Sequence, residues 1–400
     1  MDAYIYDAIR TPRGSARKSG SLTAIQPIIL VSNLLDAFSE RHTFDKEVVE
    51  DLVLGCVTQV KDQGANIAKI AALYAGWPTS MSGTTVNRFC ASGLDATGMA
   101  AMKVHSAMED VVIAGGVESV SRVPMFGDEG AWFADDHVRQ KTNFVQMGIS
   151  ADIMATLEGF SREELDEYAV QSQERAAYAR ENGYFSNAII PVKNDEGEIV
   201  LQHDELIRAE STVALLGKLD PSFERIGLGE AEKKIFEAFP QIEKVTYLHH
   251  AGNSPSLADG ASLLLIGNEK AENLLGIKPR AKILASANAS ANPFLLTGGQ
   301  EAAKKVLLKS GLRVEDIDLF EYNEAFAAAP LKFMKDLKVS RDQLNVNGGA
   351  ISMGHALGAT GGMLVATVLE ELERRGQKRG LIAVSGGGGI GTALIIERMN

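Results

Sequence analysis

Residues 90–93 read Cys-Ala-Ser-Gly, and 265 residues later residues 355–358 read His-Ala-Leu-Gly. At the same offset, residues 49–52 (Val-Glu-Asp-Leu) recur as residues 314–317 (Val-Glu-Asp-Ile). Both copies of the first motif follow a strand-like run that contains asparagine, and both precede a long helical stretch of small and apolar residues. Self-similarity at a fixed offset is typical of internal duplication, so we expect two duplicated halves.

Short runs of β-branched residues alternate with longer helical patterns in both halves. This alternation is typical of α/β proteins whose sheets are covered by helices on both faces, so the predicted fold class is α/β. The predicted strands span residues 4–8, 51–57, 110–115, 262–266, 282–287, 319–321, 381–384 and 392–397, and the main predicted helices span residues 25–41, 67–75, 91–105, 300–310 and 361–375.

The segment from residue 121 to residue 250 resembles neither half and is more polar. Ser161 and Glu164 predict a capping box at the start of a helix that Asn182-Gly183 ends. Residues 189–192 and 198–202 predict a hairpin. We therefore expect an N-terminal half (1–120, completed by about 251–272), an inserted loop domain (121–250) that serves as a lid, and a C-terminal half (273–400).

The composition is that of a globular protein, because 45 % of the 400 residues are apolar and 23 % are charged. Forty Lys and Arg against 52 Asp and Glu give a net charge of −12, which argues against nucleic acid or an anionic membrane as the main partner. Two cysteines support no disulfide framework, no metal-ligand spacing occurs, and no stretch has the ~20 apolar residues of a membrane span. The start lacks a basic, apolar leader, so the sequence predicts a cytoplasmic protein.

Cys90 and His355 are candidates for a nucleophile and its base. Cys90 stands at the start of a predicted helix, whose dipole and free N–H groups would lower the thiol pKa and favour the thiolate. His355 lies among glycines, so its imidazole can face a cavity. The alternatives are a cysteine that acts as a small buried hydrophobe and a histidine with a structural role, which is also the role predicted for the pair His249 and His250.

Two further segments offer polar groups. Asn323 follows a predicted strand, where its amide could hold a carbonyl oxygen or a water. Residues 386–391 (Gly-Gly-Gly-Gly-Ile-Gly) match the glycine spacing of a dinucleotide-binding loop, but only nine residues follow, which is too few for a crossover helix. We therefore reject a nicotinamide cofactor and expect these glycine N–H groups to suit an oxyanion hole beside a thioester oxygen.

Several segments together resemble the thiolase family in order and spacing over essentially the whole chain: Asn87–Gly93, Asn323–Phe326, Asn345–Ala350, Gly354–Gly361 and the terminal glycine loop. The resemblance implies a five-layered αβαβα fold of two duplicated halves with a loop domain between them. It implies acyl transfer with acyl-CoA and CoA as substrates, and no further cofactor or metal. It also implies a homodimer or homotetramer, and it leaves open an association with other β-oxidation enzymes.

The resemblance implies roles for individual residues. Cys90 would carry the acyl group as a thioester, and His355 would deprotonate this cysteine and help to bind the thioester oxygen. Asn323 would position a water in one oxyanion hole, and the backbone N–H groups of Cys90 and Gly387 would form the other. The segments expected to line the substrate site contribute Ala325, Phe326 and Ser254.

Ser385 is the main departure from the family pattern, which has a second cysteine here as acid and base for the α-carbon. A thiol of pKa about 8.5 can exchange protons near neutral pH, whereas a serine hydroxyl needs strong help to do so. Gly299 also replaces a proline, and Asp220 replaces a basic residue near the CoA nucleotide. The leading interpretation is a thiolase-like acyltransferase. The alternatives are a thioester hydrolase or acyltransferase without C–C bond chemistry, and a non-catalytic thiolase-like subunit.

Overall fold

The computed structural model describes residues 1–399 and is built around one large mixed sheet. Its strands are β1 (Ala3–Arg10), β2 (Gly14–Ser15), β3 (Asp51–Gly55), β4 (Ser82–Val86), β5 (Val111–Ser119), β8 (Ala258–Gly267), β9 (Ala281–Ser290), β10 (Leu319–Tyr322), β11 (Arg379–Ser385) and β12 (Ile390–Arg398). They lie in the order β10-β11-β12-β9-β1-β8-β5-β3-β4, with β2 paired to β8.

The two halves of the sheet repeat one topology outward from the centre, where β9 and β1 pair antiparallel. On one side follow β12, β11 and β10, and on the other side follow β8, β5 and β3. In each half the two inner neighbours pair antiparallel and the two outer ones pair parallel. This topology agrees with the duplication that the repeated motifs predict.

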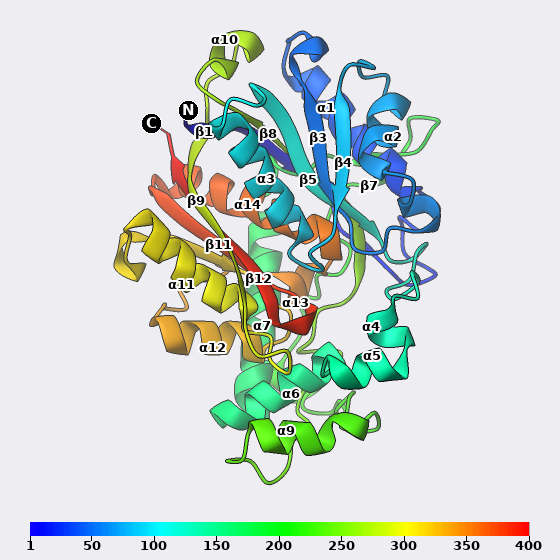
Figure 1. The fold of residues 1–400 in the computed structure, drawn as a ribbon, viewed down its shortest axis with the longest axis vertical. Helices are drawn as coiled ribbons and strands as arrows, with labels where there is room; N and C mark the ends of the chain where they lie inside the picture. The colour runs from blue at the N-terminus through cyan, green and yellow to red at the C-terminus, as the bar shows by residue number, and fades with distance from the viewer. Residues whose placement is uncertain (400) are drawn as a thin grey trace.

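Helices cover the sheet and also separate its two halves (Figure 1). The helices of the two halves are α1 (Pro27–Arg41), α2 (Ile67–Tyr74), α3 (Ser92–His105), α10 (Ala271–Leu275), α11 (Gly298–Ser310), α12 (Ala328–Leu337), α13 (Ala350–Met353) and α14 (Leu357–Arg375). α1 and α2 pack on the N-terminal strands, α11 packs on the C-terminal strands, and α3 and α14 contact strands of both halves. The resulting layers, helix–sheet–helix–sheet–helix, agree with the predicted αβαβα fold class.

α3 and α14 cross at close range through glycines. A Cβ on Gly93 would lie 2.5 Å from the carbonyl oxygen of Gly358, and a Cβ on Gly361 would lie 2.3 Å from the backbone nitrogen of Leu94. Only residues without a Cβ allow the two backbones to approach so closely. The crossing explains why α14 starts at Leu357 rather than at the predicted residue 361, because glycines that indicate a loop in the sequence belong to the helix.

The two central helices also begin in the same way. α3 begins at Ser92 and α14 at Leu357, 265 residues later, which is the offset of the sequence repeat. Phe89 (φ 48°) and Gly354 (φ 100°), also 265 residues apart, both have positive φ. Cys90 and His355 are therefore presented by equivalent turns, each two residues before its helix.

The segment between the halves contains α4 (Ala131–Ala134), α5 (Asp136–Lys141), α6 (Met147–Glu158), α7 (Arg162–Glu181), β6 (Val192–Lys193), β7 (Ile199–Leu201), α8 (Val213–Leu216) and α9 (Glu232–Ala238). The capping box of Ser161 and Glu164 is confirmed, and the predicted hairpin is present but shorter. α6 packs on α12, and α7 packs on α13. The segment is thus anchored on the C-terminal half, while its exact boundaries stay a prediction.

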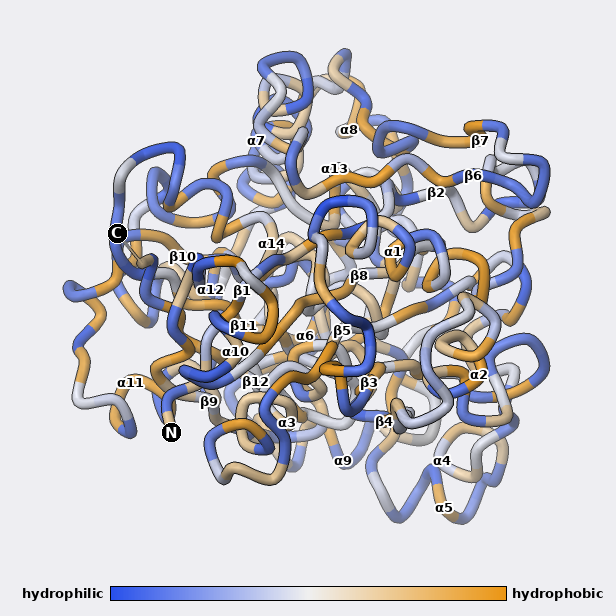
Figure 2. Tube along the Cα trace, turned by 90° about the horizontal axis from the view of Figure 1, so that it is seen from above, coloured by the Kyte–Doolittle hydropathy of each residue, from blue (hydrophilic) through white to orange (hydrophobic). Residues whose placement is uncertain are grey.

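Hydrophobic residues line the strands inside the molecule, and hydrophilic ones line the outer loops, as the orange and blue parts of the tube in Figure 2 show. The apolar core has three main clusters: one under α1 and α2, one under α11 and α12, and one around α3 and α14 between the two halves. Among the helices of residues 1–399, none has the length and apolar character that crossing a membrane requires.

Gly361→Ala should lower the free energy of unfolding by about 1–3 kcal/mol, because the added methyl group would meet the backbone of Leu94 and force α3 and α14 apart. Gly98→Ala is the matched control: its Cβ would meet only the Ser286 hydroxyl at 3.1 Å, the end of a small side chain. Urea unfolding of both variants checks this. Equal midpoints for the two variants would contradict a close-packed crossing.

Candidate active site

Nearly all predicted site residues line one cavity of about 240 Å³. The cavity lies where the turns before α3 and α14 meet the end of β11. Of the predicted residues, its wall contains Cys90, Ser254, Ala325, Phe326, His355, Ser385 and Gly387. Asn323 is buried behind this wall, two residues from Ala325. Residues far apart in the sequence therefore form one polar site, as the duplication predicts.

The Cys90 thiol is neutral in the resting protein, which corrects one expectation from the sequence. Burial and the nearby Glu118 carboxylate raise the pKa of Cys90 to about 12, although a backbone hydrogen bond acts in the opposite direction. The helix dipole alone was expected to lower this pKa, but α3 begins two residues after Cys90, at Ser92. A thiolate at Cys90 therefore requires a base that acts during the reaction.

His355 is a suitable base because its imidazole is neutral at physiological pH. Burial and the neighbouring Arg13 lower its pKa from 6.5 to about 3. Its Nδ1 lies 2.8 Å from Thr360 Oγ1, and its Nε2 has no hydrogen-bond partner in the protein. A proton on Nδ1, donated to Thr360, leaves Nε2 as a free acceptor.

Asn323 offers an amide group with both polar atoms free. Its backbone N–H donates to Ala383 O at 3.0 Å, which fixes the residue between β10 and β11. The side chain is buried, and neither its oxygen nor its nitrogen has a hydrogen-bond partner in the protein. Buried amides normally form hydrogen bonds, so this one is suited to a water or a substrate oxygen. Its role in an oxyanion hole, like that of Gly387, stays a prediction.

Ser385 ends β11 and has two hydrogen-bond partners. Its Oγ accepts from the backbone N–H of Gly299, at the start of α11, at 2.9 Å. It also lies 2.9 Å from the hydroxyl of Tyr322, the last residue of β10. The serine hydroxyl is thus held in place within the wall that it shares with Cys90 and His355.

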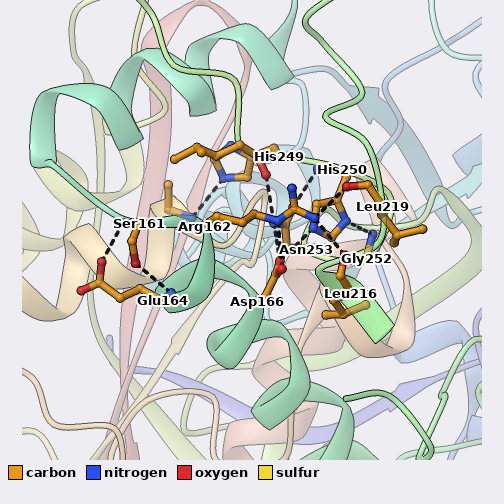
Figure 3. A network of polar contacts seen from close by, with 12 residues as sticks. Ser161, Arg162, Glu164, Asp166, Leu216, Leu219, His249, His250, Gly252 and Asn253 are labelled. Carbon is orange, nitrogen blue, oxygen red and sulfur yellow. Dashed lines mark hydrogen bonds and ion pairs between the residues drawn. The ribbon is translucent and has the colours of Figure 1, made fainter. Parts of the chain in front are cut away.

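A network on α7 positions the segment that carries Ser254 (Figure 3). Asp166 Oδ1 lies 2.8 Å from His250 Nε2 and accepts from Asn253 Nδ2 at 2.8 Å, while Asp166 Oδ2 accepts from Arg162 Nε at 2.8 Å. Burial alone would raise the pKa of Asp166, but His250 and Arg162 lower it overall. The hydrogen bonds of both histidines, with His249 Nδ1 2.7 Å from Asp152, agree with the structural role predicted for this pair.

The sequence gave no signal for the apolar part of the cavity wall, which contains Met125, Phe126, Met147, Phe223, Leu296 and Leu357. Most of these residues belong to the inserted segment, whose methionines and aromatics form no recognisable motif. Tyr322 was missed too, although it directly precedes Asn323. Within residues 1–399, no group of three or more His, Cys, Asp or Glu side chains is placed to hold a metal ion.

A larger cavity of about 630 Å³ adjoins the site and shares Phe126 and Gln146 with it. Its wall includes the cationic side chains of Arg139 and Lys234 and the ring of Phe144. Two buried hollows that share wall residues give an elongated molecule room on both sides of Phe126.

Fold and site together define a cysteine-dependent acyl-transfer enzyme. Residues 3–232 match the family model "Thiolase, N-terminal domain", and residues 277–398 match "Thiolase, C-terminal domain". The chain belongs to the thiolase family and is an acyltransferase.

Relatives and solved structures agree with this assignment over the full length. The chain is 37 % identical to a 3-oxoadipyl-CoA/3-oxo-5,6-dehydrosuberyl-CoA thiolase of Escherichia coli, with 100 % of both chains covered. It is 36 % identical to a 3-ketoacyl-CoA thiolase of Marinobacter nauticus, covering 100 % of this chain and 98 % of the relative. The crystal structure of the Bacillus anthracis acetyl-CoA acetyltransferase superposes with a TM-score of 0.86 at 32 % identity, covering 100 % and 99 % of the two chains.

His355→Gln should slow acylation of Cys90 by about 100-fold, because the neutral thiol then lacks its base. In the unaltered protein the acylation rate should stay level from pH 8 down to pH 5, since His355, with a pKa of about 3, does not gain a proton in this range. Rapid-quench mass spectrometry of Cys90 measures both. His203→Gln, on an exposed histidine, is the control. A loss of rate centred near pH 6.5 would contradict a neutral, buried base.

Asp166→Asn should lower the free energy of unfolding by about 3 kcal/mol, because it leaves buried cationic and amide donors without their carboxylate. Urea unfolding measures the effect. Asp342→Asn is the control, since that carboxylate is 98 % exposed and lies 3.9 Å from Arg175 Nη2. If both substitutions had the same small effect, the network in Figure 3 would not anchor the Ser254 segment.

Proposed function

We propose that this thiolase cleaves a 3-ketoacyl-CoA with free CoA through an acyl-enzyme on Cys90, and catalyses the reverse condensation by the same path. One observation carries the proposal: Cys90, the neutral imidazole of His355 and the hydroxyl of Ser385 line a single cavity. The relatives named as thiolases of 3-ketoacyl-CoA and of 3-oxoadipyl-CoA support a 3-ketoacyl thioester as the substrate class.

In the cleavage direction, His355 Nε2 takes the thiol proton while Cys90 Sγ attacks the 3-keto carbon. The bond between the α- and 3-carbons then breaks, the shortened acyl group stays on Cys90, and the departing acetyl-CoA enolate takes up a proton at its α-carbon. The sulfur of a free CoA finally attacks the Cys90 thioester. The unpaired amide of Asn323 suits the water of the predicted oxyanion hole.

The adjoining cavity suits the anionic part of the CoA carrier. Arg139 and Lys234 in its wall offer positive charge that phosphate groups require. This placement would compensate for Asp220, which stands where the family pattern has a basic residue.

A second candidate is acyl transfer or thioester hydrolysis without C–C bond chemistry. The observation that favours it is the hydroxyl of Ser385 where the family pattern has a thiol, since an unassisted hydroxyl is a poor acid and base near neutral pH. Free carboxylic acid as the product, instead of acetyl-CoA and a shortened acyl-CoA, identifies this activity.

We also propose that the chain forms a homodimer or homotetramer in the cytoplasm and associates with other enzymes of β-oxidation. β4 supports the oligomer, because it ends the sheet with exposed Ser82 and Thr84, and α2 beside it exposes Ile70, Leu73 and Tyr74. The two cysteines are free thiols, as a reducing compartment favours.

Acetoacetyl-CoA should acetylate Cys90, because cleavage leaves the acetyl group on the nucleophile, and free CoA should remove that group. Intact-protein mass spectrometry with and without CoA measures both steps. Cys90→Ala should abolish the adduct, whereas Cys56→Ala, in the loop after β3, should retain it. An adduct that survives Cys90→Ala would refute the assigned nucleophile. If the unaltered protein forms none, longer 3-ketoacyl-CoA and 3-oxoadipyl-CoA substrates decide whether the proposal stands.

A further inference from the structure

The proposed cleavage leaves an electron pair on the α-carbon of the departing acetyl-CoA, and some group in the cavity must protonate it. Among the wall residues, the side chains with an exchangeable proton on sulfur, oxygen or an imidazole nitrogen are Cys90, His355, Ser254 and Ser385. Cys90 is the nucleophile and His355 is its base. Ser254 Oγ has no hydrogen-bond partner in the protein, so nothing tunes its acidity. Ser385 remains, and its surroundings differ from those of an ordinary serine.

The first special feature of Ser385 is the helix that points at it. Gly299 is the second residue of α11, a helix of 13 residues, and its N–H donates to Ser385 Oγ at 2.9 Å. The N-terminus of a helix stabilises nearby negative charge. Thr297, the residue that would normally cap this end, makes no side-chain cap hydrogen bond. Ser385 therefore takes part of the capping role and receives the favourable field.

The glycine at position 299 makes this contact possible. A Cβ there would lie 2.7 Å from the backbone carbon of Val384 and 2.8 Å from the nitrogen of Ser385, so a larger residue would push α11 away from β11. The N–H is equally necessary, because the proline of the family pattern at this position could not donate.

The second special feature is a phenol on the other side of the serine. The Tyr322 hydroxyl lies 2.9 Å from Ser385 Oγ, and its ring is buried and stacked on Phe333 at 4.4 Å between centroids. Leu296 O, at 3.4 Å, is the other acceptor within reach of this hydroxyl. When Tyr322 donates to Ser385, the serine accepts two hydrogen bonds, and its own proton is free to point into the cavity.

We propose that Ser385 is the acid and base for the α-carbon, with Tyr322 as its proton partner and the N-terminus of α11 as the stabiliser of the negative charge. This inference rests on the proposed function and assigns a positioning and proton-supplying role to Tyr322.

The protons balance over the two half-reactions. In the first, Ser385 gives its hydroxyl proton to the α-carbon of the departing acetyl-CoA, and Tyr322 gives its proton to Ser385 Oγ. One proton has reached carbon, and the negative charge rests on the phenolate. In the second, the thiol of the incoming CoA gives its proton to Ser385 as the sulfur attacks the Cys90 thioester. Ser385 passes its own proton to Tyr322, which restores both hydroxyl groups.

Acidity favours Tyr322 over an isolated serine as the proton source. Burial raises the pKa of Tyr322 to about 12, while the hydrogen bond from Ser385 acts in the opposite direction. A phenol remains a stronger acid than an aliphatic hydroxyl, which does not titrate in the range of protein side chains. A charge that would be costly on serine can thus be passed one bond further from the substrate.

Two reactions of one protein separate this role from a structural one. Thiolysis of acetoacetyl-CoA requires proton transfer at carbon, whereas exchange of the acetyl group between acetyl-CoA and isotopically labelled CoA requires Cys90 and His355 but breaks no C–C bond. Tyr322→Phe should lower the rate of thiolysis by about 100-fold and should lower the exchange rate far less. Tyr6→Phe is the matched control, because it removes a different buried hydroxyl that donates to Asn268 O at 2.8 Å.

A second background makes the test specific to the Tyr322–Ser385 pair. Ser385→Cys supplies a thiol that exchanges protons near neutral pH without a phenol, so adding Tyr322→Phe to it should change thiolysis by less than about 3-fold. An equal loss in both backgrounds, an equal loss in thiolysis and exchange, or no loss in Tyr322→Phe would each overturn the role of Tyr322. Absence of both thiolysis and Cys90-dependent exchange in the unaltered protein would instead refute the proposed function itself.

Discussion

The site depends on the close crossing of α3 and α14. Gly93 and Gly361 let the two backbones touch, so the ends of the helices, and the turns before them, meet at one point between the two halves of the sheet. Glu118 fixes this junction, because its buried carboxylate accepts from the backbone N–H of Gly358 at 3.0 Å and of Val57 at 2.9 Å. A bulkier crossing would separate the nucleophile from its base without changing either residue.

The cavity holds its reactive groups in neutral form. The Cys90 thiol and the His355 imidazole both have pKa values shifted toward the uncharged state, mainly by burial. Proton transfer between two neutral groups creates charge only while the reaction proceeds, when a bound substrate oxygen can stabilise it. An ion pair present from the start would instead cost desolvation in every resting molecule. The buried site therefore favours a cysteine that becomes reactive when the substrate arrives.

The sequence predicted the fold and the polar site because both leave local, repeated signals. The offset between Cys90 and His355 is that of two real turns, and the strand and helix patterns follow periodicities that burial imposes. The failures have physical causes. The glycines near residue 361 indicate a loop only when the partner helix is unknown, and the pKa of Cys90 depends on burial and Glu118, which no local pattern contains. Tyr322 acquires meaning only through Ser385, 63 residues away in sequence.

The equivalent turns at Phe89 and Gly354 have a consequence for how such a site can arise. In a symmetric ancestor made of two identical halves, both turns would present the same side chain, and two cysteines or two histidines could not act as nucleophile and base for each other. Joining the halves in one chain removes that restriction, since each copy can then change independently. Division of labour between Cys90 and His355 thus requires the covalent link as much as it requires the shared architecture.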